Sequence, residues 1–131
     1  MIDLSNQMFD VIKGDLEILE QGLQEAVTST NELVTEVGMH LVTSGGKRIR
    51  PALCLLSARG GKAFDLPHVL PLAEALELIH TASLVHDDVI DEADTRRGAA
   101  TANARWNNQV AILSGDYIFA RAFALLAEAG Y

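Results

Sequence analysis

The segment from about residue 109 to 129 is apolar almost all round, and it constrains the fold more than any other part of the sequence. A helix of this kind lies at the centre of a bundle or presses against another subunit, because all of its faces need cover from water. Gly130 is expected to cap its C-terminus. The 131 residues are enough for one domain, but about five helices are too few to surround such a segment. We therefore expect the chain to self-associate or to pack against a partner.

Four further helices are predicted from apolar residues spaced three and four apart and from residues that favour helix ends. They are expected over about residues 5–28, 31–44 and 50–60, and from about residue 67 through an acidic cluster. Asn31 is expected to cap the second of them at its N-terminus. Residues 98–108 are predicted to form a loop with a short helical turn around Trp106. No Val/Ile/Thr-rich alternation predicts a strand, so the fold class is all-α with about five helices.

The charge balance narrows the class of ligand. With 10 basic and 18 acidic residues, the net charge of −8 argues against a general affinity for nucleic acid, whose phosphates would be repelled. Local basic clusters at 47–50 and 96–97 point instead to small anionic ligands.

Three features of the sequence predict where the protein is located. Cys54 is the only cysteine, which fits a reducing cytosol, and the N-terminus lacks the basic region of a signal peptide. Asp116 and Arg121 interrupt the apolar C-terminal segment, so we expect no membrane span and a cytoplasmic location.

Five carboxylates lie within eight residues and are followed by two arginines. They are Asp87, Asp88, Asp91, Glu92 and Asp94, with Arg96 and Arg97 directly after. Asp87 and Asp91 are four apart, which puts both on one helical face, and hard oxygen ligands in this arrangement suit Mg²⁺. The arginines offer cationic forks for phosphate oxygens of the same ligand. The alternative is a solvated acidic face, but the mainly apolar residues before Asp87 favour the metal site.

A second candidate anion site is the segment Ser44-Gly-Gly-Lys-Arg-Ile-Arg-Pro51. Its glycines let backbone N–H groups approach an anion at the start of a helix, and Lys47 and Arg50 can close on phosphate oxygens. The alternative is a helix end followed by solvated basic residues. His80 lies within about 20° of the helical line through Asp87 and Asp91, so it is a candidate anion donor. His86 is predicted to be structural, and His40 and His68 receive no role.

Together these motifs resemble the trans-isoprenyl (polyprenyl) diphosphate synthases, from about residue 30 to the C-terminus. The resemblance implies the N-terminal part of an isoprenoid-synthase helical bundle that condenses isopentenyl diphosphate with an allylic diphosphate. It also implies that two groups of residues act on these substrates. The isopentenyl diphosphate would be bound by Lys47, Arg50, His80 and Arg97. Mg²⁺ on the allylic diphosphate would be bound by Asp87 and Asp91, with Asp88 in support and Arg96 beside the diphosphate. The catalytic residues would be Asp87, Asp91 and Arg96. Ala82, where a bulky aromatic would close the cavity early, implies a long-chain product.

The chain departs from the family in its length. Family members are more than twice as long and carry a second aspartate-rich motif, whereas this sequence has one such cluster. We expect residues 1–131 to be the N-terminal half of the synthase domain, inactive alone, and to form a homodimer or to associate with the missing half. The first alternative is a non-catalytic small subunit of a heteromeric synthase, which would not need these ligands. The second is a terpene cyclase, which would not need the second diphosphate site, and the third is a purely structural helical bundle.

Overall fold

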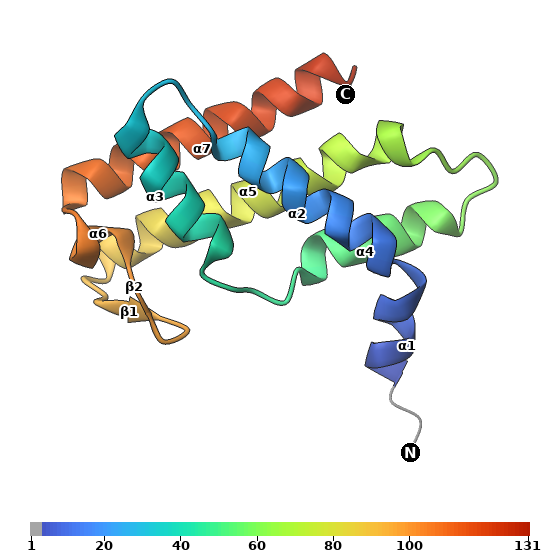
Figure 1. The fold of residues 1–131 in the computed structure, drawn as a ribbon, viewed down its shortest axis with the longest axis horizontal. Helices are drawn as coiled ribbons and strands as arrows, with labels where there is room; N and C mark the ends of the chain where they lie inside the picture. Colours follow the sequence, from blue (N-terminus) through green and yellow to red (C-terminus); the bar gives the residue numbers. More distant parts are fainter. Residues whose placement is uncertain (1–3) are drawn as a thin grey trace.

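The computed structural model describes residues 4–131 as a helical bundle with one very small hairpin (Figure 1). The helices are α1 (Leu4–Val11), α2 (Lys13–Val27), α3 (Glu32–Thr43), α4 (Ile49–Arg59), α5 (Leu66–Ile90), α6 (Ala102–Arg105) and α7 (Asn108–Glu128); the strands are β1 (Thr95–Arg96) and β2 (Ala99–Ala100). The all-α prediction is confirmed, but the described residues form seven helices where about five were predicted.

Two long helices form the frame of the molecule. The antiparallel pair α5 and α7 makes the most extensive helix–helix contact, and α2 and α4 pack across α5 (Figure 1). Small residues on α7 let the pair approach closely: the position that a Cβ would take at Gly115 lies 2.5 Å from His86 Nε2. His86 also lies 3.1 Å from the Ile112 carbonyl oxygen, which agrees with its predicted structural role.

The predicted helix ends agree with the structure at several places. Asn31 caps α3, because its Oδ1 accepts a hydrogen bond from the Val34 amide at 3.2 Å. Asn107 caps α7 in the same way through the Val110 amide. Gly60 caps α4, and Gly130 has a left-handed φ of 86° directly after the α7 C-cap. Side-chain caps and glycines of this kind satisfy backbone groups that the helix leaves unpaired.

Two predictions of local structure are wrong. The helix expected over 5–28 is interrupted at Ile12, which is fully buried between α1 and α2. No strand was predicted, but residues 95–100 contain the antiparallel pair β1 and β2, in which Thr95 faces Ala100 and Arg96 faces Ala99. Strands of two residues are too short to produce an alternating sequence pattern.

The helix α7 is long and apolar enough to cross a membrane by length and composition, and it is the one helix of the described residues that passes this test. Core helices of globular proteins pass it too. One face of α7 packs into the bundle, chiefly against α5, and its residues Ala111, Ile118 and Ala122 are at most 1% exposed. The other face leaves Leu113 and Phe123 each 60% exposed. The prediction that this helix needs further cover agrees with that exposure.

An acidic side chain lies buried in the contact between α2 and α5. Glu74 is 6% exposed and fills the space beside Gly22, where a Cβ would collide with its carboxyl group. Burial, with a further contribution from Glu25, raises the pKa of Glu74 to about 7. The folded chain therefore keeps a proton that the unfolded chain, with the ordinary pKa of 4.5, gives up at lower pH.

The free energy of unfolding should accordingly fall as the pH rises from 4.5 to 7. Above pH 7, Glu74 should cause no further fall. Between pH 5 and pH 8, we expect the free energy of unfolding of wild type to fall by about 2 kcal/mol relative to that of Glu74→Gln. Urea unfolding of both proteins across this range measures the difference, in which the other titrating groups cancel. Parallel stability curves for the two proteins would contradict the prediction.

Candidate functional site

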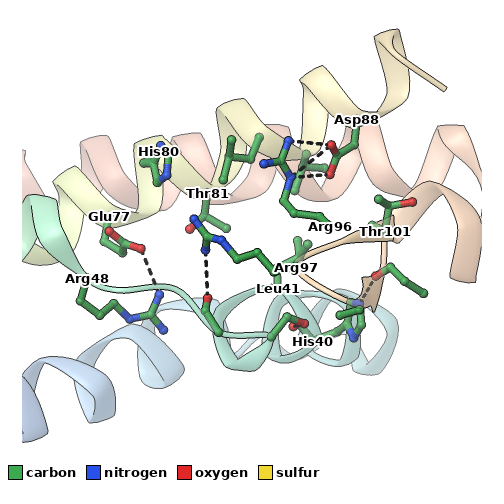
Figure 2. A pocket seen from close by; sticks show the side chains of 17 residues that line it. His40, Leu41, Arg48, Glu77, His80, Thr81, Asp88, Arg96, Arg97 and Thr101 are labelled. Carbon is green, nitrogen blue, oxygen red and sulfur yellow. Dashed lines mark hydrogen bonds and ion pairs between the residues drawn. The ribbon is translucent and has the colours of Figure 1, made fainter. Parts of the chain in front are cut away.

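One face of α5 carries the side chains that define the site. Glu77, His80, Thr81 and Leu84, spaced three and four apart, face the segment between α3 and α4 and the β1–β2 hairpin (Figure 2). Further along α5, Asp87 is exposed, and Asp91 is the exposed C-cap residue whose amide donates to the Asp87 carbonyl oxygen at 2.8 Å. The helix thus presents an imidazole and two carboxylates in sequence along its length.

The segment from Gly45 to Arg48 turns the chain sharply from α3 into α4. Gly45 and Gly46 have φ values of 101° and 136°, and Arg48 has a φ of 54°, which is uncommon for a residue with a side chain. The Arg48 side chain points inward and donates to Glu20, to Glu77 at 3.0 Å and to the Val42 carbonyl oxygen. With Arg48 held inside, its neighbours Lys47 and Arg50 are exposed.

Four predicted diphosphate ligands come together in one cavity. A cavity of about 110 Å³, here called the basic cavity, is lined by Lys47 from the α3–α4 connection, Arg50 from the first turn of α4, His80 from α5 and Arg97 from the hairpin. Arg50 Nη1 lies 3.3 Å from His80 Nε2, and Arg97 Nη1 lies 3.4 Å from the Gly45 carbonyl oxygen. Three segments distant in sequence therefore gather positive charge at one place, which suits an anion with several oxygens.

The surroundings of His80 favour the neutral form of its ring. Burial lowers the pKa of His80, and the charge of Arg50 lowers it further; Glu77 opposes the shift. Because a guanidinium can only donate, Nε2 of His80 accepts from Arg50 and the proton lies on Nδ1. His80 can therefore donate one hydrogen bond to a ligand without adding a full charge.

A second cavity of about 60 Å³ lies next to the basic cavity, between α3, α5 and the hairpin (Figure 2). Asp88 and Arg96 line it and bind each other: Asp88 Oδ1 lies 2.8 Å from Arg96 Nη2, and Asp88 Oδ2 lies 3.0 Å from Arg96 Nε. The hydrogen bond to Asp88 raises the pKa of Arg96. Asp88 is buried and bound to Arg96, whereas its neighbour Asp87 is exposed, so the metal-binding role of Asp88 stays a prediction.

The carboxylates that remain for a cation are Asp87 and Asp91. Within residues 4–131, neither of them forms an ion pair, and no three His, Cys, Asp or Glu side chains are close enough to hold a metal ion. Two hard oxygen donors fit Mg²⁺, which commonly takes one or two protein carboxylates together with waters and phosphate oxygens. The residues present therefore fit a metal that binds with a phosphate ligand, and do not fit a cage built by this segment alone.

The hairpin holds Arg97 in a strained conformation. Its two-residue turn, Arg97-Gly98, has φ values of 51° and 78°, which is the type I′ geometry that favours Asn-Gly. An arginine here costs about 1 kcal/mol relative to a residue that tolerates the left-handed region. Such strain persists where the surroundings enforce it, and it occurs at binding sites.

Sequence reasoning missed the residues that hold the site in shape. Glu77 received no role, although it and Glu74 are the only acidic residues between Pro71 and Val85, and that isolation was the available signal. Arg48 was counted only as part of a basic cluster, and it is the buried partner of Glu77. Ala82 was expected to leave room beneath the site, but it is fully buried in the core and lines neither cavity.

Comparison with known proteins gives consistent matches. The sequence profile of the polyprenyl synthetase family matches residues 31–131. The chain is 46% identical over 127 residues to the all-trans-nonaprenyl-diphosphate synthase (geranyl-diphosphate specific) of Rhodobacter capsulatus, covering 97% of this chain and 39% of that protein. It is 50% identical over 123 residues to heptaprenyl diphosphate synthase component 2 of Geobacillus stearothermophilus, covering 94% of this chain and 38% of that protein.

Solved structures agree with this result. A polyprenyl synthase from Caulobacter crescentus, complexed with calcium and isoprenyl diphosphate, superposes with a TM-score of 0.89 at 35% identity, over 94% of this chain and 37% of that one. A decaprenyl diphosphate synthase from Rhodobacter capsulatus superposes with a TM-score of 0.86 at 39% identity, over 96% of this chain and 39% of that one. The chain thus spans about two fifths of the length of the relatives it matches.

Proposed function

The chain belongs to the polyprenyl synthetase family, and from this we propose that it supplies the diphosphate-binding wall of a trans-prenyltransferase. The reaction would join isopentenyl diphosphate to an allylic diphosphate and lengthen a polyprenyl chain. The observation that carries the proposal is the convergence of Lys47, Arg50, His80 and Arg97 on one cavity, beside the helix that presents Asp87 and Asp91.

The residues of this chain would act by binding and by charge. Lys47, Arg50 and Arg97 would hold the diphosphate of isopentenyl diphosphate, with the neutral His80 donating one hydrogen bond. Asp87 and Asp91 would hold Mg²⁺, which when bound neutralises charge on the departing diphosphate. Arg96, oriented by Asp88, would stabilise the same charge as the allylic C–O bond breaks. The double bond of isopentenyl diphosphate then attacks the allylic carbon, and a proton is lost.

Product length and location belong to the same proposal. Matched relatives are named nonaprenyl, heptaprenyl and octaprenyl diphosphate synthases, which supports a long-chain product. We propose a cytoplasmic location, supported by the packing of α7 on α5. Since the relatives are much longer, we propose that residues 1–131 are part of the synthase domain and have little activity alone. A clear steady-state turnover by the purified chain would contradict this.

A second function has one observation in its favour. The relative at 50% identity is a component 2 of a heptaprenyl diphosphate synthase, and that name suggests a heteromeric enzyme. This chain would then act with a partner subunit. The presence of both the basic cavity and the Asp87/Asp91 pair favours a catalytic role over a purely regulatory subunit.

The exposed face of α7 supports association with a second copy or with the rest of the domain. Ile112, Leu113 and Phe123 are 42%, 60% and 60% exposed, which is unusual for large apolar side chains on one helix. We expect sedimentation velocity of the chain to show dimers or larger species that dissociate when Leu113 and Phe123 are replaced by serine. A clean monomer at high concentration would contradict the proposal.

The direct test is calorimetric titration with inorganic pyrophosphate, with and without Mg²⁺. We expect Mg²⁺ to raise the affinity roughly tenfold or more, since the cation bridges carboxylates and phosphate. Asp87→Asn and Asp91→Asn should abolish this gain. Glu92→Gln is the matched control, because it removes one charge from the same exposed segment and should keep the gain. No pyrophosphate binding under either condition would overturn the proposed function.

The basic cavity is tested in the same titration by Arg97→Asn. Asparagine suits the type I′ turn, so this variant should be at least as stable as wild type. It should nevertheless bind pyrophosphate roughly tenfold more weakly, with or without Mg²⁺, because one charged hydrogen-bond donor is lost. Unchanged affinity would exclude Arg97 from the anion site.

A further inference from the structure

His40, a half-buried residue of α3, is bonded on both sides of its ring. Its Nε2 lies 2.8 Å from the Ala100 carbonyl oxygen at the end of β2. Its Nδ1 lies 3.1 Å from Nη1 of Arg105, and the edge of its ring meets Trp106 at a centroid distance of 5.4 Å. No motif in the sequence predicted a role for this residue.

These contacts determine which ring nitrogen of His40 carries the hydrogen. The Arg105 guanidinium has no acceptor, so Nδ1 of His40 must accept and Nε2 must carry the hydrogen. Nε2–H then donates to the Ala100 carbonyl oxygen. Arg105 is itself paired with Glu36, whose Oε1 lies 3.7 Å from Arg105 Nη2, and the cavity that His40 lines also contains Asp88, Arg96 and Arg97. A doubly protonated ring would turn an N–H toward the guanidinium and lose that contact.

The bond to Ala100 fixes the strand that follows Arg97. On the side of α5, the hairpin is held by Asp88 through Arg96, and the Ala93 carbonyl oxygen accepts from Thr101 and Asn103. On the side of α3, two contacts link the hairpin to α3 and the segment after it: His40 with Ala100, and Arg97 with the Gly45 carbonyl oxygen (Figure 2). The second contact is long, at 3.4 Å, so the first is the stronger anchor.

We propose that His40 is a positioning residue, which holds the hairpin against α3 so that Arg97 faces Lys47 and Arg50 across the basic cavity. The inference rests on the proposed diphosphate site and adds a residue that does not touch the ligand. His40 lines the second cavity and not the basic cavity, so its effect on a diphosphate passes through the hairpin.

The test compares His40→Leu with His40→Gln. Leucine keeps most of the volume and removes both hydrogen bonds, whereas glutamine offers one acceptor to Arg105 and one donor to Ala100. In titrations with inorganic pyrophosphate, we expect His40→Leu to lose roughly five- to tenfold in affinity and His40→Gln to stay within roughly twofold of wild type. Wild-type affinity in His40→Leu would overturn the inference.

A double-mutant cycle separates positioning from general destabilisation. In the Arg97→Asn background, His40→Leu should change the pyrophosphate affinity by less than roughly twofold, because the side chain that it positions is gone. An equal loss in both backgrounds would overturn the inference in favour of a structural role. Nitrogen-15 shifts of the imidazole, recorded without ligand, should show the Nε2–H tautomer, and the opposite tautomer would also overturn it. Absence of pyrophosphate binding by wild type would overturn the proposed function and this role with it.

Discussion

Arg48→Met should destabilise the chain by about 3 kcal/mol, because it leaves the Glu77 carboxylate buried without its cation. The Arg48 and Glu77 side chains are 12% and 7% exposed, so water replaces little of the lost contact. Glu20, the second partner, is 40% exposed and can turn to solvent, so its contribution is small. Methionine keeps the unbranched apolar stem of the side chain and removes the guanidinium group, so most of the loss comes from the missing charge and its hydrogen bonds.

Urea unfolding of wild type and Arg48→Met measures the loss. The control is the double variant Arg48→Met/Glu77→Met, in which an apolar pair replaces the ion pair and no buried charge is left. We expect it to be clearly more stable than Arg48→Met alone, since replacing both partners of a buried pair is often close to neutral. A loss below about 1 kcal/mol in Arg48→Met would mean that Glu77 finds another partner or water.

Gly38→Ala is expected to have the second largest effect. Gly38 lies in α3 where this helix crosses the end of α2, and an added Cβ would lie 2.7 Å from Val27 Cβ and 3.3 Å from the Val27 carbonyl oxygen. Val27 is fully buried and β-branched, so it cannot rotate away, and the helices must separate. Overpacking of this kind costs about 1–3 kcal/mol.

Gly14→Ala is the matched control, because Gly14 is also helical and an added Cβ meets nothing within 4 Å. Alanine there should stabilise the chain by about 0.5–1 kcal/mol, since it restricts the unfolded chain. The two substitutions add the same methyl group, so the unfolding free energies of the two variants should differ by about 1.5–4 kcal/mol. Equal effects would show that the α2–α3 contact can relax.

The sequence was sufficient to predict the features that depend on local chemistry. The caps at Asn31 and Gly130 follow from side-chain hydrogen bonding and from the access of glycine to a left-handed φ, which act within a few residues. The family resemblance assigned Lys47, Arg50 and His80 to one diphosphate site. The structure places these residues around one cavity, and their role in binding stays a prediction.

The features that were missed depend on contacts between distant segments. Whether Arg48 points inward, with Lys47 and Arg50 outside, depends on Glu77 on another helix, and periodicity cannot show this. Asp88 could not be distinguished from Asp87 by residue type, although positions one apart on a helix differ by about 100° and therefore meet different neighbours. The break at Ile12 is a single buried residue between two helical stretches, and the spacing of apolar residues hardly changes across it.

The continuity of α5 has a consequence for the spacing of the two proposed diphosphate sites. His80 and Asp91 belong to one helix, and a rise of 1.5 Å per residue places them about 16 Å apart along its axis. No side-chain substitution can change this separation. An inserted residue between them would also rotate everything beyond it by about 100°, so only a gain or loss of nearly whole turns keeps both groups on one face. The distance between the two proposed diphosphate sites can therefore change only in steps of about 5 Å, whereas the α4–α5 loop is free to vary in length.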